Sequence, residues 1–381
     1  MKLKKIALLV TVALSSTLAH ADVRINGFSN LTAGVTSKET DLFGYSKDID
    51  FTNNSLFAIQ VAGDVDDNVT ATAQILARGE NGYEAEFEWA YLTYTLNDNS
   101  SFTAGRFRLP VFRYSASLDV GYSYHWISAP VSVYDVSFNN INGLRYDYSN
   151  YSGDFEYLAQ ISVGNYESEI SGGINEGSDV ILLSFEGNFH NFKGRIVWGQ
   201  GDNVFKQPEL DAALDGIAQV SPTLSEELAV DDDKGDFIGV GLEYDNFNWF
   251  ISGEYTKTTL KDSLTPDDTA FYITAGTRIG KYTPHVTFQT RDGAGEIKFT
   301  DTVNALPEPF RTVIGNFNAG LQSSFFEDYS MVTVGVRYDL TTNVALKAEL
   351  SKYDNKLDEQ LLDAESTLDT NAAAFSVNYV F

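Results

Sequence analysis

The chain of 381 residues contains no cysteine, only 4 histidines and no long apolar run in its interior. The absence of cysteine excludes disulfide bonds and thiolate metal sites. A transmembrane helix needs about 20 consecutive apolar residues, so none is predicted. Basic residues are also few: 26 Lys and Arg stand against 53 Asp and Glu, and the formal net charge is −27. Because nucleic acids bind to basic patches, a nucleic-acid partner is not expected.

The first 21 residues have the pattern of a cleaved signal peptide. Three lysines within the first five residues precede the apolar segment 6–18, and Ala19-His20-Ala21 fits the small-residue cleavage pattern. The apolar segment is shorter than a spanning helix, which disfavours a retained anchor. We therefore predict export of a mature chain, residues 22–381, that forms a single domain.

The dominant pattern in the mature chain is a period of two. In residues 331–340, apolar side chains at every second position alternate with polar or small ones, and residues 271–279 repeat the pattern. Such alternation predicts strands with one apolar and one polar face. A soluble sandwich would bury the apolar face in a core, whereas a membrane barrel turns it toward lipid.

Strand length and loop length favour the membrane barrel. Many predicted strands have nine or more residues, enough to cross a bilayer when tilted, and short turns alternate with long loops as in outer-membrane barrels. We predict an all-β fold, a 16-stranded antiparallel transmembrane β-barrel around an aqueous channel. The predicted strands are 22–35, 52–62, 69–78, 84–96, 101–108, 141–149, 154–164, 179–187, 191–199, 237–245, 248–257, 269–279, 282–291, 330–340, 343–353 and 371–381. In strand 84–96, strict alternation would place three glutamates on the same face as Leu92 and Tyr94, so we predict a β-bulge near Trp89-Ala90.

The connection after the fifth strand is long, aromatic and weakly charged. It leaves the strand at Leu109-Pro110. We predict that residues 109–140, the long third outer loop, fold back into the lumen and narrow the channel. Its tyrosines Tyr114, Tyr122 and Tyr124 would either offer flat, hydrogen-bonding faces to solutes or pack the loop against the wall.

Arginines near this loop are predicted on the inner wall, because a cationic side chain facing lipid costs about 2–4 kcal/mol at the bilayer midplane. We expect them to line one side of a constriction and the two acids of the loop to lie opposite, since charges in a narrow pore filter ions. The alternative role for each arginine is an ion pair that only holds the loop. The predicted set is Arg78, Arg106, Arg108 and Arg145, with Asp119 and Asp135 as the loop acids.

The sequence gives little support for catalysis. No nucleophile elbow, His-x-x-x-His or EF-hand pattern occurs, and no metal or cofactor is predicted. An outer-membrane hydrolase would need a Ser/His pair, for which His125 is the only candidate base.

Other long connections are acidic, for example 201–236 and 354–370. Charge runs usually keep loops solvated. Alternatively, these loops gather cations, or divalent ions that bridge lipopolysaccharide. A surface adhesin or phage receptor acting through them is also compatible with a pore.

Three segments resemble the general porins of the gammaproteobacterial outer membrane: the opening strand 22–28, the stretch 89–110 with its Gly-Arg-Phe-Arg, and the terminal Phe381. The resemblance covers most of the chain in pattern. It implies a homotrimer in the outer membrane, in contact with lipid and lipopolysaccharide, with the third outer loop folded into the lumen. The last strand is similar to the signal that the barrel-assembly machinery reads, here Phe375, Val377, Tyr379 and Phe381. The enterobacterial loop motif Pro-Glu-Phe-Gly-Gly is absent, so the constriction residues above rest on strand alternation and on the Gly-Arg-x-Arg segment.

Together these features predict a non-enzymatic channel for passive diffusion of small hydrophilic solutes and ions. A solute-specific channel, for a sugar or an organic acid, is the alternative.

Overall fold

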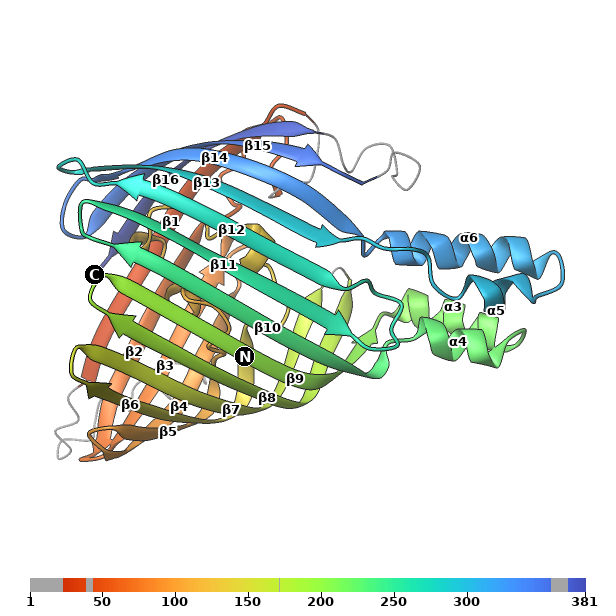
Figure 1. Cartoon of the computed structure of the whole chain (residues 1–381), viewed down its shortest axis with the longest axis horizontal. Coiled ribbons are helices and arrows are strands. Elements are labelled where there is room, and N and C mark those ends of the chain that lie inside the picture. Colours follow the sequence, from red (N-terminus) through yellow and green to blue (C-terminus); the bar gives the residue numbers. More distant parts are fainter. Residues whose placement is uncertain (1–22, 39–43, 171, 358–368) are drawn as a thin grey trace, which may run out of the picture.

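The chain forms a closed barrel of sixteen strands (Figure 1). The computed structural model describes residues 23–38, 44–170, 172–357 and 369–381. Each strand pairs antiparallel with its neighbours in sequence, and β1 pairs with β16 from Phe28–Val380 to Thr36–Ala372. Closure leaves no strand edge unpaired, as a sheet in lipid requires. The predicted 16-stranded fold is confirmed, while the predicted signal peptide lies outside the described residues.

The strand bounds follow the alternating segments of the sequence. They are β1 (Val23–Thr36), β2 (Leu56–Asp66), β3 (Val69–Arg78), β4 (Ala85–Asn97), β5 (Ser100–Arg108), β6 (Asn140–Ser152), β7 (Phe155–Ile170), β8 (Gly173–Phe189), β9 (Phe192–Lys206), β10 (Asp231–Asp245), β11 (Trp249–Leu260), β12 (Asp268–Thr277), β13 (Tyr282–Gly293), β14 (Glu327–Asp339), β15 (Val344–Asn355) and β16 (Thr370–Val380).

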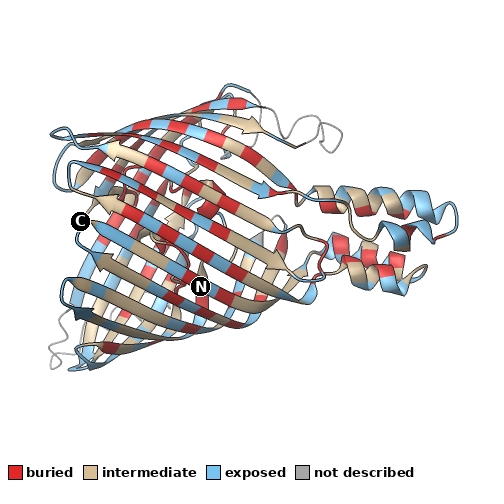
Figure 2. Cartoon of the chain, viewed as in Figure 1, coloured by how far each residue is buried: buried red, intermediate tan, exposed pale blue. Residues whose placement is uncertain are grey.

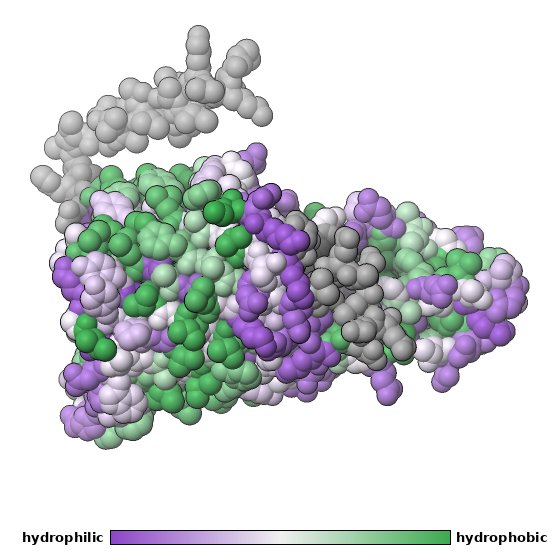
Figure 3. Space-filling view, turned by 90° about the horizontal axis from the view of Figure 1, so that it is seen from above, coloured by the Kyte–Doolittle hydropathy of each residue, from purple (hydrophilic) through white to green (hydrophobic). Residues whose placement is uncertain are grey.

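Alternate side chains face opposite sides of the wall. On β14, Val334 is 58% exposed on the outside, whereas Met331 is 4% exposed on the inside. Figure 2 shows buried and exposed residues alternating along the strands of the near wall. Figure 3 shows hydrophobic side chains gathered over the barrel wall and hydrophilic ones toward the end that carries the helices. An apolar outer band of this kind is what lipid solvates.

The predicted bulge on β4 is confirmed and lies at Glu88. Gln74 of β3 pairs with Trp89, but Ile75 pairs with Phe87, so Glu88 is an extra residue in the ladder. Because one extra residue flips the alternation, the glutamates before it and the polar face after it both point inward.

Short turns occupy one end of the barrel and long connections the other, which we call the outer mouth. The predicted strands 154–164 and 179–187 end too early, and the long connection 165–178 that they imply is wrong: β7 and β8 continue as a hairpin to Ile170 and Gly173. The hairpin carries pairs such as Glu167–Glu176. These strand ends have no apolar face, so their sequence resembles a loop although the backbone pairing continues.

Two long connections at the outer mouth contain helices that the sequence analysis did not predict. The β9–β10 connection forms α3 (Pro208–Ala218) and α4 (Pro222–Leu228), and the β13–β14 connection forms α5 (Thr300–Asn304) and α6 (Phe310–Ser323). We call α3–α6 the helical cap; Figure 1 shows it projecting beyond the barrel. Among the described residues, no helix combines the length and hydropathy needed to cross a membrane.

A separate hydrophobic core holds the helical cap together. It joins buried residues of both connections: Leu210, Leu214, Ile217, Leu224, Leu228, Val303, Leu306 and Ile314. Pro208 and Pro222 occupy first-turn positions of α3 and α4, and Ser221 caps α4 by accepting a hydrogen bond from the Leu224 amide. Proline and serine are favoured at these positions because the first amides of a helix have no partner within the helix.

Candidate channel constriction

The connection between β5 and β6, the third outer connection of the chain, leaves the wall part-way along the barrel. Strand β5 has only nine residues, and its last ladder pair joins Arg108 to Asn140. The Leu109 amide then donates to the Asn139 carbonyl at 2.9 Å. Residues 109–139, which we call the inserted loop, therefore start inside the barrel rather than at its rim.

Glycine permits the close backbone approach at this point. Gly105 has φ +129°, and a Cβ there would lie 2.4 Å from the carbonyl oxygen of Ala90. Gly164 has φ +157°, and a Cβ there would lie 2.2 Å from the carbonyl oxygen of Asn142. L-residues avoid such dihedral angles, so the wall beside the inserted loop depends on these two glycines.

The inserted loop spans the lumen. Asp119 accepts a hydrogen bond from Arg78 of β3 at 3.1 Å, and the Tyr134 hydroxyl donates to Glu254 of β11. β3 and β11 lie eight places apart in a ring of sixteen strands, so they are on opposite walls. The loop carries three short helical turns: η3 (Ser115–Ser117), η4 (Gly121–Ser123) and α2 (Val131–Tyr134).

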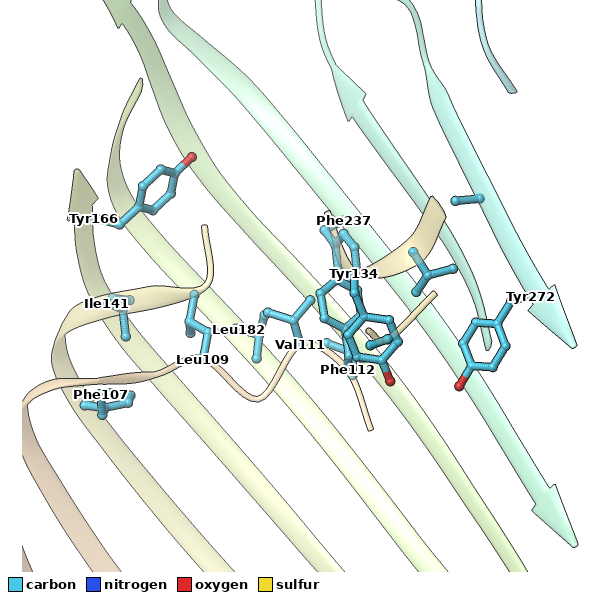
Figure 4. Close-up of a cluster of buried hydrophobic side chains, with 14 of the residues drawn as sticks. Phe107, Leu109, Val111, Phe112, Tyr134, Ile141, Tyr166, Leu182, Phe237 and Tyr272 are labelled. Carbon is cyan, nitrogen blue, oxygen red and sulfur yellow. The ribbon is translucent and has the colours of Figure 1, made fainter. Parts of the chain in front are cut away.

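One flank of the inserted loop packs on the wall through apolar side chains. Leu109, Val111 and Phe112 are buried in one cluster with Leu182 of β8 and Phe237 of β10 (Figure 4). The ring centroids of Phe112 and Phe237 are 6.0 Å apart. This packing fixes the flank, because removing such side chains from water stabilises the folded state.

The three predicted tyrosines serve the loop's own packing. Tyr124 is buried, and its hydroxyl donates to the Leu118 carbonyl at 2.8 Å. Tyr122 donates to the Thr342 carbonyl in a short turn at 2.8 Å. Tyr114 lies edge-on to Tyr124, and burial raises the pKa of Tyr114 to about 12. Of the two roles considered from the sequence, these contacts favour packing over a stacking surface for solutes.

Side chains of the opposite wall complete the attachment by hydrogen bonding to the backbone of the inserted loop. The Ile127 amide donates to Glu349 of β15 at 2.9 Å, and Arg337 of β14 donates to the Tyr124 carbonyl at 2.8 Å. Lys347 donates to the Gly121 carbonyl. Side chains of the wall thus satisfy backbone groups of the inserted loop.

A network of buried ion pairs lies where the inserted loop meets β3, β4 and β5. Glu88 pairs with Arg108 at 2.8 Å and with Arg78 at 3.1 Å. Asp119 of the loop pairs with both arginines. The side chains of Glu88 and Arg108 are only 4% and 6% exposed. At the exposed edge of the network, Glu86 pairs with Arg78 at 3.0 Å and Glu80 lies 4.0 Å from its Nε. Four carboxylates thus surround two guanidinium groups.

The structure brings together only part of the predicted charge set. Arg78, Arg108 and Asp119 meet directly, so Asp119 does not face the arginines across an open gap as predicted. Among the described residues Arg106 makes no ion pair, and its Nε donates to the Glu88 carbonyl at 3.3 Å. The predicted single cluster is therefore wrong for Arg106, because the ladder pairs it with Ala90 beside the outward-facing Leu92.

Arg145 and Asp135, the other two members of the predicted charge set, lie elsewhere. Arg145 pairs with Asp147 at 3.0 Å, on β6 below the inserted loop. Asp135 is 74% exposed and lies 4.0 Å from Arg291 of β13. Alternation could place Arg145 on the inner face, but only the path of the loop decides which arginine Asp135 meets. Alternation and the predicted bulge could place Glu88 on the inner face, but its ion pairs with Arg78 and Arg108 were not predicted.

The open part of the lumen is displaced toward β4–β8. Thr274, Thr287 and Lys347 face inward on β12, β13 and β15, and each is 1% exposed beneath the inserted loop. On β6 and β8, by contrast, the side chains of Arg145 and Glu186 are 21% and 26% exposed. Above the loop, toward the outer mouth, lies a cavity of about 840 Å³, which we call the vestibule. Its lining includes Arg78, Arg108, Asp119, Trp126, Arg291 and Glu327.

His125 is packed between the inserted loop and the wall. Its Nε2 lies 3.2 Å from the Thr274 hydroxyl, and its ring packs on Trp126 and Phe250. Among the described residues, no group of three or more acidic or histidine side chains is arranged to hold a metal ion.

The four C-terminal residues singled out in the sequence lie on the outward face of the last strand. Phe375, Tyr379 and Phe381 are exposed, and Val377 is half-buried. Phe381 exchanges backbone hydrogen bonds with Gly27 at 2.9 and 3.0 Å. The last residue thus helps to close the barrel, while its role as an assembly signal stays a prediction.

Comparison with known proteins agrees with this geometry. A family model described as Gram-negative porin matches residues 7–380. The chain belongs to the Gram-negative porin family. Family and barrel fold together place this porin in the outer membrane of Gram-negative bacteria. No curated protein matches the porin in sequence.

Solved structures share the fold of this porin at low sequence identity. The outer membrane channel DcaP of Acinetobacter baumannii has a TM-score of 0.64 and 11% identity, covering 96% of this chain and 99% of that one. An anion-selective porin from Comamonas acidovorans has a TM-score of 0.59 and 12% identity, with 95% and 100% coverage. The trimer form of OmpT, an outer membrane protein of Vibrio cholerae, has a TM-score of 0.56 and 11% identity, again with 95% and 100% coverage.

Proposed function

We propose that this porin is a passive channel for small hydrophilic solutes and ions, with a preference for cations. The observation that carries the proposal is the ion-pair network at the constriction, in which four carboxylates surround Arg78 and Arg108. These carboxylates belong to Glu80, Glu86, Glu88 and Asp119. Fully ionised, these six groups carry two excess negative charges. Charges in a confined, low-dielectric passage act strongly on passing ions, so the sign of this excess favours cations.

Two further ion pairs on the inner wall do not reverse that sign. Arg145 is matched by Asp147 at 3.0 Å, and Arg195 is matched by Glu186 at 3.4 Å. Each of these pairs is neutral overall. The acidic outer loops would add to the preference by concentrating cations at the outer mouth.

Export and assembly are part of the same proposal. Residues 1–21 would be removed as a signal peptide, and Phe375, Val377, Tyr379 and Phe381 would be read by the barrel-assembly machinery. The mature chain would form a homotrimer, as the trimer form of OmpT does. Its outer band would contact lipid and lipopolysaccharide.

The experiment is a reversal-potential measurement on purified porin in a planar bilayer, across a tenfold gradient of potassium chloride. We expect discrete conductance steps and a reversal potential of the sign given by cation flow. An anion-selective potential would contradict the charge argument. A folded barrel that gives no conductance would contradict the channel itself.

A further inference from the structure

A second cavity lies beside the vestibule and differs from it in chemistry. It has a volume of about 280 Å³, at the outer mouth between the end of the inserted loop and the base of the helical cap. Its walls are largely aromatic and aliphatic, and its rings are Phe138, Tyr166, Phe205, Phe237 and Phe325. We call it the aromatic cavity. Passage of hydrophilic solutes does not require apolar surface of this kind, which is unfavourable in contact with water.

The rings of the aromatic cavity form two groups. Phe138 of the inserted loop lies 6.1 Å from Tyr166 and 5.7 Å from Phe237, between ring centroids. Phe205 and Phe325, at the base of the helical cap, are 6.3 Å apart in a T-shaped arrangement. Phe138, Phe205 and Phe325 are only half-buried, so ring faces remain for a further ring to contact.

The size of the aromatic cavity suits a single small molecule. An apolar cavity of about 150 Å³ is sufficient to bind benzene in a protein core. A cavity of about 280 Å³ therefore accommodates one aromatic ring with a short substituent.

Charge is concentrated where the aromatic cavity meets the vestibule. Arg291 and Glu327 line both cavities. Asp268 engages Arg291 through Nε at 2.9 Å and Nη2 at 2.6 Å, while Glu327 lies 2.7 Å from Nη1. Asp135 of the inserted loop lies 4.0 Å from the same guanidinium. Three carboxylates thus surround one cation.

Of the two carboxylates that both contact Arg291 and line the aromatic cavity, Glu327 is the more available to a solute. Its side chain is 49% exposed, whereas that of Asp268 is 26% exposed and is held by two guanidinium nitrogens. A cationic group at the junction would meet this excess negative charge, and its attached ring would enter the aromatic cavity. Aromatic faces also attract cations directly.

We propose that the aromatic cavity is a binding site for small aromatic amines, with the ring among Phe138, Phe205 and Phe325 and the ammonium group at Glu327. The inference rests on the proposed channel, and it names a solute class that the channel holds before release into the vestibule. A bound molecule at this junction would obstruct the vestibule, so occupancy should be visible as interruptions of ionic current.

The test uses phenethylamine as the probe on the full mature porin. Block of single-channel current in planar bilayers is compared with block by ethylamine, which has the charge without the ring, and by 2-phenylethanol, which has the ring without the charge. We expect phenethylamine to block at concentrations at least about fivefold lower than either, from combined ring and charge contacts. Equal potency of the three compounds would overturn the proposal.

Two variants localise the site. Glu327→Gln removes the charge and Phe325→Ala removes one ring, and each should weaken phenethylamine block by about fivefold or more. The matched controls are Glu209→Gln and Phe310→Ala, exposed residues of α3 and α6 within the helical cap, which should leave block unchanged. Unchanged block in both cavity variants would overturn the site, and Glu327→Gln keeps the test valid if Phe325→Ala disturbs the cap.

Calorimetric titration of phenethylamine into detergent-solubilised porin separates the two proposals. Binding that depends on Glu327, without any conductance, would overturn the channel and retain the site. Conductance without measurable binding would overturn the site and retain the channel.

Discussion

Arg108, the last residue of β5, forms an ion pair with Asp119 of the inserted loop inside the barrel. Both side chains are largely shielded from water, and Glu88 and Arg78 belong to the same network. Burying charges is costly unless each is paired, so the position of the inserted loop and the charge of the wall are coupled. A change at either residue should alter both stability and ion preference.

Asp119→Asn should shift ion selectivity. The substitution removes one of the two excess negative charges of the network, so we expect the reversal potential in a potassium chloride gradient to move toward zero. Asp301→Asn, on the exposed first turn of α5, is the matched control and should leave the potential unchanged. An Asp119→Asn channel as cation-selective as the parent would contradict the assignment of the constriction.

Arg108→Met should destabilise the folded barrel. It leaves Glu88 buried with one partner fewer, and breaking a buried ion pair costs about 3–5 kcal/mol. The midpoint of urea unfolding in detergent, followed by the gel mobility of unheated samples, measures the loss. Arg24→Met is the control, because the Arg24–Asp64 pair is exposed and should contribute little. Equal midpoints for the two variants would show that the buried network has no special role.

Gly105→Ala should impair folding of the wall beside the inserted loop. The added Cβ would lie 2.4 Å from the Ala90 carbonyl oxygen at a φ of +129°, which combines a steric clash with an unfavourable backbone conformation. We expect a reduced yield of folded barrel on refolding into detergent. Gly216→Ala in α3 meets no atom within 4 Å and should be neutral or slightly stabilising. Normal refolding of Gly105→Ala would contradict the close approach of β4 and β5.

Leu224→Ala should loosen the helical cap and spare the barrel. Leu224 is fully buried in the core of the cap, and removing such a side chain costs about 2–5 kcal/mol. We expect faster proteolytic cleavage within residues 207–229 and unchanged channel conductance. Val313→Ala, at an exposed position of α6, should leave the cleavage rate as it is. Loss of conductance in Leu224→Ala would show that the cap supports the channel.

The sequence predicts the barrel well because the membrane imposes a simple rule. Every second side chain in a strand must suit lipid, so the segment 331–340 identifies β14 without knowledge of its neighbours. The bulge could be predicted from conflict alone, since Glu88 and Leu92 cannot share a face. Where strands leave the membrane the rule no longer applies, and the 165–178 hairpin was mistaken for a loop.

The site is harder to predict because its contacts are long-range. Alternation places Arg78 and Arg108 on the wall, but their meeting with Asp119 depends on the path of a loop whose sequence has no period. The sequence of the helical cap contains a helical pattern of apolar residues, which its acidic composition obscured. Leu210, Leu214 and Ile217 recur at helical spacing after Pro208, a pattern that favours an amphipathic helix.

Two separate hairpins contribute to one hydrophobic core in the helical cap, and this constrains engineering of the cell-surface side of the molecule. Exchanging one of the two connections alone would expose leucines of the other connection to solvent, which would favour aggregation of the protein. A peptide grafted for display therefore belongs in an independent turn such as 81–84, whose residues are all exposed.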